Sequence, residues 1–239
     1  MDAIRDLSFD CIFRLGQLRH DRGLLTALIE RWRGETHTFH LPFGEATVTL
    51  EDVHHILGLP TEGDPLILRG ESTTVEDRRD LVGEFLGLLP ADDDDVNRSG
   101  LKIKWLVHNF GSCEWLDPAD IGYGAQVSFH VWAHLLCVIG SLFPDSSRNR
   151  VQLDLLWLLR DMGKLRQYSW GSAVLAFLYR KLCYSSWAGK SDFYGYATLL
   201  QVWIYERFPS LAPRHAAEPL FEYPLTLRWK APLSHGDVP

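Results

Sequence analysis

Apolar side chains recur at helical spacing along much of the chain. In residues 21–32, Leu24, Leu28 and Trp32 follow one another at every fourth position, which places them on one face of a helix. Asp21 stands where its carboxylate would cap the first turn of that helix. The same periodicity predicts further helices over about 124–142, 150–161, 170–184 and 194–207.

Two shorter helices are predicted from their N-terminal caps. Thr49 precedes Asp52 by three positions, and Thr74 precedes Asp77 by three positions. This spacing is typical of a capping box, in which the two side chains bond each other's backbone N–H groups. The first of these helices is expected to end at Gly58, because glycine adopts the left-handed conformation that closes many helices.

The periodicity changes from helical to alternating after Gly34. Residues 36–41 and 46–50 are rich in threonine and apolar side chains, and Pro42 begins the turn between them. This pattern predicts one small β-hairpin near residues 36–50. The predicted fold class is therefore mostly α, a multi-helix globular domain with that single hairpin.

The C-terminal part of the chain has a different composition. Prolines recur at 209, 213, 219, 224 and 232, and they interrupt helical structure. We expect a single domain over residues 1–208 and a Pro-rich extended tail over residues 209–239. The longest apolar run, residues 131–139, contains His134 and falls short of the roughly 20 residues that a membrane-spanning helix needs, so no membrane contact is expected.

Charge is unevenly distributed along the 239 residues, whose formal net charge is −7. Residues 1–99 hold 10 Lys and Arg against 20 Asp and Glu, whereas residues 145–190 hold eight against three. Clustered cations are what phosphate binding requires, although solvated helix faces have the same composition. The predicted phosphate-contacting residues are Arg148, Arg150, Lys164, Arg166, Arg180 and Lys181.

Motifs for catalysis, cofactors and metals are incomplete. Gly189, Lys190 and Ser191 match the end of a phosphate-binding loop, but Tyr184 occupies the position of its first glycine. His130, His134 and Cys137 share one face of the predicted helix over 124–142, where the favoured interpretation is a hydrogen-bonded core face rather than a metal site. No catalytic residue, cofactor or metal site is predicted.

Several sequence blocks follow one another in a fixed order, at residues 30–32, 35–41, 44–45, 47–53, 57–60, 142–147, 168–176, 178–183 and 199–203. Together they resemble the plant mobile domain family, which is also labelled aminotransferase-like. The resemblance extends from about Leu24 to Phe208. The motif residues are expected to be mainly architectural, because large rings at regular spacing usually lie in a core. These residues are Trp32, Glu35, Thr36, His37, Phe39, Trp170 and Tyr179.

The resemblance implies a domain shared by transposable elements and plant nuclear proteins. It implies a nuclear location and roles in meristem maintenance, genome integrity and transposon silencing. It also implies two protein partners, a Ser/Thr phosphatase-like protein and other plant mobile domain proteins. The basic stretch adds duplex DNA as a third expected partner. Because family members continue past residue 208 with helical sequence, the chain is expected to be a short member or a fragment.

These observations lead to one function hypothesis and one alternative. The hypothesis is a non-catalytic nuclear module that binds DNA or scaffolds a chromatin-linked complex. The alternative is a transposon-derived enzyme relic of the nuclease or recombinase type. Transaminase activity is not expected, because none of the six lysines stands in the setting that a pyridoxal-phosphate site requires.

Overall fold

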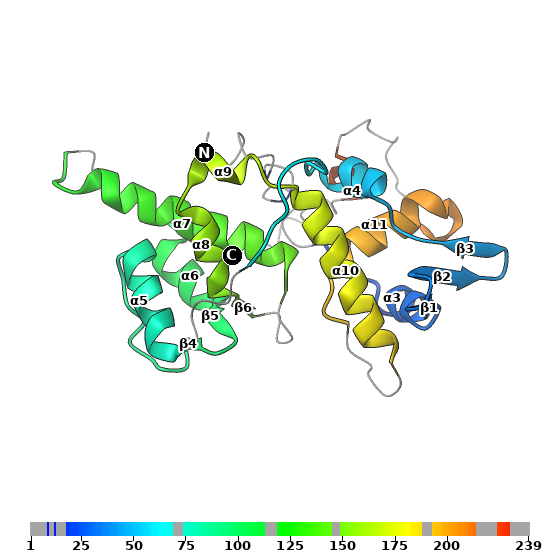
Figure 1. Ribbon diagram of the computed structural model, residues 1–239, viewed down its shortest axis with the longest axis horizontal. Coiled ribbons are helices and arrows are strands. Elements are labelled where there is room, and N and C mark those ends of the chain that lie inside the picture. The colour runs from blue at the N-terminus through cyan, green and yellow to red at the C-terminus, as the bar shows by residue number, and fades with distance from the viewer. Residues whose placement is uncertain are drawn as a thin grey trace. The chain divides into compact units, whose positions relative to one another are not determined.

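The computed structural model describes residues 9, 12, 18–68, 74–112, 119–144, 149–187, 193–213 and 224–229 (Figure 1). The chain divides into two compact units. The first unit comprises residues 1–65 and 168–239, and the second comprises residues 66–167. The domain boundary expected at residue 208 stays a prediction.

Four helices form most of the described part of the first unit: α3 (Arg22–Ile29), α4 (Leu50–Leu57), α10 (Trp170–Ser186) and α11 (Ala197–Arg207). The predicted caps are confirmed. Asp21 accepts a hydrogen bond from the backbone N–H of Leu24, and Thr49 and Asp52 form the capping box of α4. Helix α4 ends at Gly58 in the left-handed conformation, with φ 70°. The predicted helices over 170–184 and 194–207 correspond to α10 and α11.

The predicted hairpin is confirmed and belongs to a three-stranded antiparallel sheet. Strands β2 (Thr38–Leu41) and β3 (Gly44–Ala46) form the hairpin, and β1 (Trp32–Arg33) pairs with the other edge of β2. The register places Trp32 opposite Phe39. The predicted helix over 21–32 is wrong at its end, because α3 stops at Ile29 and Trp32 pairs with Phe39 in the sheet. Strand β1 has only two residues, which are too few to show an alternating pattern.

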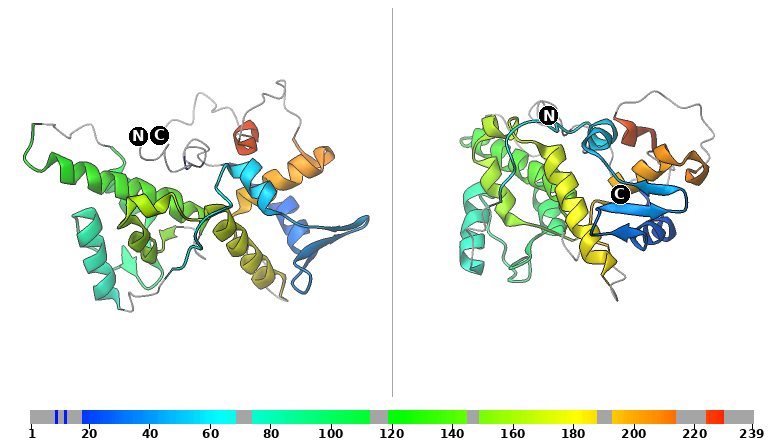
Figure 2. Two further views of the ribbon diagram at one scale, coloured as in Figure 1. Left: turned by 45° about the horizontal axis from the view of Figure 1, so that its top comes forward. Right: turned by 45° about the vertical axis from the view of Figure 1, so that its right-hand side comes forward.

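The second unit is built around α7 (Tyr123–Leu142), which matches the helix predicted over 124–142 and contacts α5 and α6. Helix α5 (Val75–Leu86) begins at the predicted Thr74–Asp77 capping box. A second small sheet has the strand order β4-β5-β6 (Figure 2). The remaining elements are β4 (Val96–Asn97), β5 (Gly100–Lys102), α6 (Ile103–Phe110), β6 (Arg150–Val151), η1 (Leu153–Leu155), α8 (Leu156–Leu159) and α9 (Met162–Leu165).

The second sheet corrects two predictions. The fold contains more β structure than the single hairpin, although it remains mostly α. The helix predicted over 150–161 is wrong at its start, where Arg150 and Val151 pair with β5. Only η1 and the single turn of α8 follow. The spacing of the leucines predicted one continuous helix, but the first two residues of that range form strand β6 instead.

Among the residues that the structure describes, α7 is long and apolar enough to cross a membrane, judged by length and composition. In this fold, many apolar side chains of α7 lie in the core of the second unit. They pack against α5, α6 and β6 as the central helix of the second unit, and Leu135, Leu136, Ile139 and Leu142 are fully buried. The expected absence of membrane contact stays a prediction.

The part of the tail that the structure describes departs from an extended chain. Residues Pro209–Leu211 form η2, and residues Leu225–Trp229 form η3, which contacts α4 and α11. Thr226 donates a hydrogen bond to the carbonyl of Ile56, and Trp229 Nε1 donates to Glu206 over 2.7 Å. Leu227 and Trp229 are buried, so apolar burial holds this segment against the first unit.

Candidate functional site

Four of the seven motif side chains meet in one aromatic cluster of the first unit. The motif cluster consists of Trp32, His37, Phe39 and Tyr179. The ring of Trp32 lies 4.8 Å from that of Phe39 and 5.2 Å from that of Tyr179, measured between centroids. The His37 ring stacks on the Tyr179 ring at 5.7 Å, with 7° between their planes. Blocks from two distant parts of the sequence are thereby joined.

Hydrogen bonds fix the orientation of the motif cluster. The Tyr179 hydroxyl donates to the backbone carbonyl of Val48 over 2.6 Å and lies 2.9 Å from Thr47 Oγ1. Trp32 Nε1 donates to Cys183 Sγ over 3.3 Å. The first two bonds connect α10 with the segment that follows the hairpin. The bond from Trp32 connects β1 with α10. These bonds account for the presence of Tyr and Trp, whose polar atoms need partners when the rings are packed.

The backbone of His37 is in the left-handed region, with φ 54°, and His37 is the non-glycine residue among those described that has a positive φ. This conformation costs an ordinary L-residue about 1–2 kcal/mol. Thr47 Oγ1 donates to the His37 carbonyl over 2.8 Å, and the Tyr179 ring covers the imidazole. The chain therefore holds this turn through specific contacts.

Trp170 lies apart from the motif cluster, at the start of α10. It is fully buried and packs edge-to-face on Phe9, with centroids 5.0 Å apart. The next residue, Gly171, donates its backbone N–H to the carbonyl of Pro60 over 2.7 Å. A Cβ at Gly171 would lie 2.8 Å from Thr61 Cγ2. The block at 168–176 thus packs directly on the segment that follows α4, which explains the glycine.

Glu35 and Thr36 are exposed, unlike the packed rings of the motif. Thr36 Oγ1 lies 2.7 Å from Thr38 Oγ1, and Thr38 donates to Glu45 Oε2 over 2.8 Å. His40 Nε2 lies 3.4 Å from Glu45 Oε1. These residues form a polar strip on the hairpin, so the motif combines packed rings with a solvent-facing edge.

The predicted phosphate-contacting cations fall into two groups. Lys164 and Arg166 belong to the second unit and are exposed, whereas Arg180 and Lys181 lie on α10 in the first unit. Arg180 is exposed, and Lys181 is half-buried with Nζ 5.1 Å from the centre of the Phe177 ring. Arg148 lies outside the described residues. Phosphate binding by this set stays a prediction.

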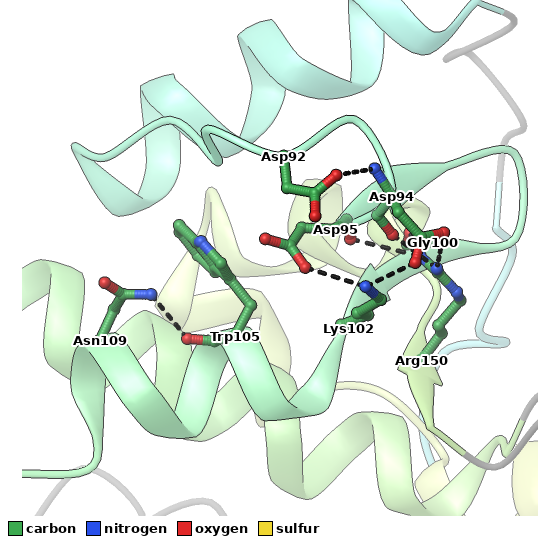
Figure 3. A network of polar contacts seen from close by, with 8 residues as sticks. All are labelled: Asp92, Asp94, Asp95, Gly100, Lys102, Trp105, Asn109 and Arg150. Carbon is green, nitrogen blue, oxygen red and sulfur yellow. Dashed lines mark hydrogen bonds and ion pairs between the residues drawn. The ribbon is translucent and has the colours of Figure 1, made fainter.

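Arg150 occupies an internal position in the second unit, with 8% of its surface exposed (Figure 3). Its Nη1 donates to the carbonyls of Gly100 and Asp95, over 3.1 and 3.3 Å. Its Nη2 donates to the Asp94 carbonyl over 2.6 Å and lies 3.2 Å from the Asp94 carboxylate. The guanidinium therefore closes the loop before β4, and phosphate contact at Arg150 would require that loop to open.

Two of the four carboxylates at 92–95, those of Asp94 and Asp95, pair with cations in the network that Figure 3 shows. Lys102 Nζ lies 2.7 Å from Asp94 Oδ2 and 3.2 Å from Asp95 Oδ1. The hydrogen bond and charge of Lys102 lower the pKa of the Asp94 carboxyl below its ordinary value, and the two aspartates raise the pKa of Lys102. Sequence reasoning found the loop but missed both cations, because strand pairing brings Arg150 beside Lys102 from a distant part of the chain.

The histidines of α7 bond the helix backbone. His130 Nδ1 donates to the Gln126 carbonyl over 2.9 Å, and His134 Nδ1 donates to the His130 carbonyl over 2.8 Å. Burial raises the pKa of the Cys137 thiol to about 11, which keeps it protonated near neutral pH. Across the described parts of the chain, no group of three or more His, Cys, Asp or Glu residues is arranged to hold a metal ion.

Comparisons with known proteins give a consistent result. The family model described as plant mobile domain matches residues 11–237. The Arabidopsis thaliana protein MAIN-LIKE 1 is 39% identical over 232 residues, which are 96% of this chain and 44% of that protein. Protein MAINTENANCE OF MERISTEMS, from the same plant, is 36% identical over 220 residues, which are 91% of this chain and 44% of that protein.

A third relative is named as a phosphatase homolog and has a similar sequence identity. The Arabidopsis thaliana serine/threonine-protein phosphatase 7 long form homolog is 37% identical over 239 residues, which are 95% of this chain and 17% of that protein. The chain thus spans less than half the length of each of these curated relatives. No solved structure matches the chain.

Proposed function

The chain belongs to the plant mobile domain family, and from that premise we propose that it is a non-catalytic nuclear module that binds duplex DNA and holds a chromatin-linked assembly together. We place this module in meristem maintenance, genome integrity and transposon silencing. The names of two relatives, MAINTENANCE OF MERISTEMS and MAIN-LIKE 1, support the first of these roles. A phosphatase-like protein and other plant mobile domain proteins are its proposed protein partners.

The use of the motif side chains carries the non-catalytic part of this proposal. A catalytic constellation needs polar or nucleophilic groups that converge on a space for substrate. The motif cluster instead directs its polar atoms at the protein itself: Tyr179 bonds the Val48 carbonyl, and Trp32 bonds Cys183. These residues therefore stabilise the fold, and other residues on the protein surface are proposed to bind the partners.

A second observation supports a modular role. Relatives of very different names share this stretch, and it makes up 44% of one and 17% of another. A domain that is joined to different neighbours is expected to supply recognition rather than a complete reaction. We include a phosphatase-like partner because one relative that contains this stretch is named as a serine/threonine-protein phosphatase homolog.

The charge pattern supports binding to DNA. Residues 145–190 hold eight cations against three anions in a chain whose net charge is −7. Lys164, Arg166 and Arg180 present exposed side chains within this stretch. Phosphate contacts depend on such cations, and an acidic remainder limits non-specific association.

Duplex binding is tested by fluorescence anisotropy of a short labelled duplex at low and moderate salt. The test variant changes Lys164, Arg166 and Arg180 to Glu. A matched control changes Arg22, Arg98 and Lys104 to Glu, which are exposed cations outside the basic stretch and alter the net charge equally. We expect similar affinities for the wild type and the control, and a much weaker but measurable affinity for the test variant at low salt. Equal affinities of the two variants, or no binding by the wild type at low salt, would refute the DNA-binding role.

A further inference from the structure

Helix α10 has two different faces. Its core face carries four fully buried side chains at every fourth position, namely Trp170, Val174, Leu178 and Leu182. An α-helix has 3.6 residues per turn, which directs Arg180 and Tyr184 away from that core face, and Trp187 follows as the C-cap residue of the helix. We call these three residues the α10 stripe. Figure 1 shows α10 as the long yellow helix.

The α10 stripe exposes large aromatic surfaces. Tyr184 exposes 49% of its surface and Trp187 exposes 78%, and Arg180 is exposed as well. At a rise of 1.5 Å per residue, the backbones of Arg180 and Tyr184 are about 6 Å apart along the axis of α10. Trp187 is the C-cap residue that follows Ser186, the last residue of the helix. Two large rings exposed close together in the sequence are unusual, because aromatic side chains normally contribute their area to a core or to an interface.

The charge of α10 indicates what kind of partner such rings meet. The segment 170–187 contains two cations, Arg180 and Lys181, and no Asp or Glu. Lys181 lies beside the stripe, with its Nζ 5.1 Å from the centre of the Phe177 ring. Cations interleaved with aromatic faces complement a ligand that offers phosphates and flat bases. A purely apolar protein surface would leave both cations without a role in the contact.

The rings also favour one form of nucleic acid. In a duplex, each base is stacked between its neighbours and presents only its edges in the grooves. A ring that approaches from the protein surface stacks on a base only when the base is unpaired and accessible.

We infer that the α10 stripe binds single-stranded nucleic acid, with bases stacked on Tyr184 and Trp187 and phosphates held by Arg180 and Lys181. This inference rests on the proposed nucleic-acid-binding function and specifies a strand form and a site for it. Lys164 and Arg166 belong to the second unit, whereas Arg180 is a proposed phosphate contact for both forms of nucleic acid. The rings of Tyr184 and Trp187 are proposed to contact only unpaired bases, so variants of these two residues separate the two activities.

The experiment measures the affinity of the whole chain for labelled oligothymidylate of about 16 nucleotides, a length that one single-strand site covers. Oligothymidylate serves as the probe because its bases are unpaired. The variants are Tyr184→Ala and Trp187→Ala. The matched control is Phe43→Ala, which removes an exposed ring of the first unit away from α10. Each variant is also measured on duplex DNA, and its thermal unfolding is recorded.

The expected result is a loss of single-strand affinity of about tenfold for each alanine variant, the effect of removing one base–aromatic stack. Trp187→Phe should restore most of the affinity, since Phe keeps a ring face. Phe43→Ala should match the wild type, and duplex affinity should be unchanged in all variants. Single-strand affinity that is insensitive to both alanine variants would overturn the inference and assign the stripe to a protein partner, while duplex binding would leave the proposed function intact. Failure to bind either form would overturn both.

Discussion

The imidazole of His37 lies parallel to the phenol ring of Tyr179, with 5.7 Å between ring centroids and 7° between ring planes. His37 lies in the turn between β1 and β2, and Tyr179 lies on α10. The sequence block that contains His37 and the block that contains Tyr179 therefore pack directly against each other. This relationship explains why the family pattern contains aromatic residues at distant positions without a catalytic constellation around them.

Loss of the Tyr179 hydroxyl should weaken the fold. Tyr179→Phe keeps the ring but leaves the carbonyl of Val48 without its 2.6 Å hydrogen bond. We expect the free energy of unfolding to fall by about 1 kcal/mol, as for other lost hydrogen bonds. Urea denaturation measures this change. Tyr123→Phe removes the hydroxyl of a half-buried ring at the start of α7 and should change stability by less than about 0.5 kcal/mol. Equal effects of the two substitutions would contradict a specific role for the Tyr179–Val48 bond.

The positive φ of His37 predicts an order of stability among its variants. His37→Ala and His37→Gly both remove the ring that stacks on Tyr179. Glycine relieves the cost of a φ of 54°, whereas alanine keeps it. His37→Gly should therefore be more stable than His37→Ala by about 1 kcal/mol. Thermal unfolding of the two variants measures the difference in stability. An alanine variant at least as stable as the glycine variant would contradict the left-handed backbone conformation of His37.

The close approach at Gly171 predicts a difference between two helical glycines. A Cβ at Gly171 would lie 2.8 Å from Thr61 Cγ2 and 3.0 Å from the Pro60 carbonyl, whereas nothing lies within 4 Å of a Cβ at Gly124 in α7. Gly171→Ala should destabilise the fold by about 1–3 kcal/mol through overpacking. Gly124→Ala should be neutral or stabilising by up to about 1 kcal/mol, because alanine favours helix. Chemical denaturation of both variants checks the prediction, and it fails if the two substitutions have the same effect.

Lys102 should control the titration of Asp94. Its hydrogen bond and charge hold the pKa of the Asp94 carboxyl below its ordinary value. In Lys102→Met, the Asp94 pKa should rise toward that ordinary value, which a carboxyl-detected NMR titration measures. An unchanged pKa would contradict the ion pair at 2.7 Å.

The same pair predicts a pH window for stability. A carboxyl whose pKa is lowered by folding contributes stability above its unfolded pKa, and that contribution is lost as pH falls through the lowered value. A lysine whose pKa is raised contributes stability below its unfolded pKa, and that contribution is lost as pH rises through the raised value. The stability advantage of the wild type over Lys102→Met should therefore be present near neutral pH and decline at both extremes. An advantage that does not vary with pH would show that Lys102 acts through packing alone.

Sequence reasoning succeeded where the signal was local. The capping boxes at Thr49 and Thr74, the glycine stop at Gly58 and the hairpin over 38–46 each depend on residues within one turn or loop. The second sheet was missed because its strands have two or three residues, too few for an alternating pattern to emerge. The surrounding leucines suggested a helix instead.

The candidate site was predictable in type but not in detail. Charge counting located the basic stretch, yet it did not separate exposed Lys164 from buried Arg150. Burial of Arg150 follows from its pairing with Lys102 across β5 and β6, a long-range contact that spacing does not reveal. The motif residues were identified by resemblance, whereas the stacking of His37 on Tyr179 required the fold.

The central claim is that exposed cations of this chain bind duplex DNA, namely Lys164 and Arg166 in the second unit and Arg180 in the first. The salt dependence of duplex affinity tests this most directly, measured for the wild type and for the Lys164, Arg166 and Arg180 to Glu variant. If each cation neutralises one phosphate, removing it should reduce the slope of log affinity against log salt by about 0.9. We predict a steep slope for the wild type and a slope reduced by about this amount per cation in the variant, with unchanged thermal stability. A slope that is the same in both proteins would contradict the account.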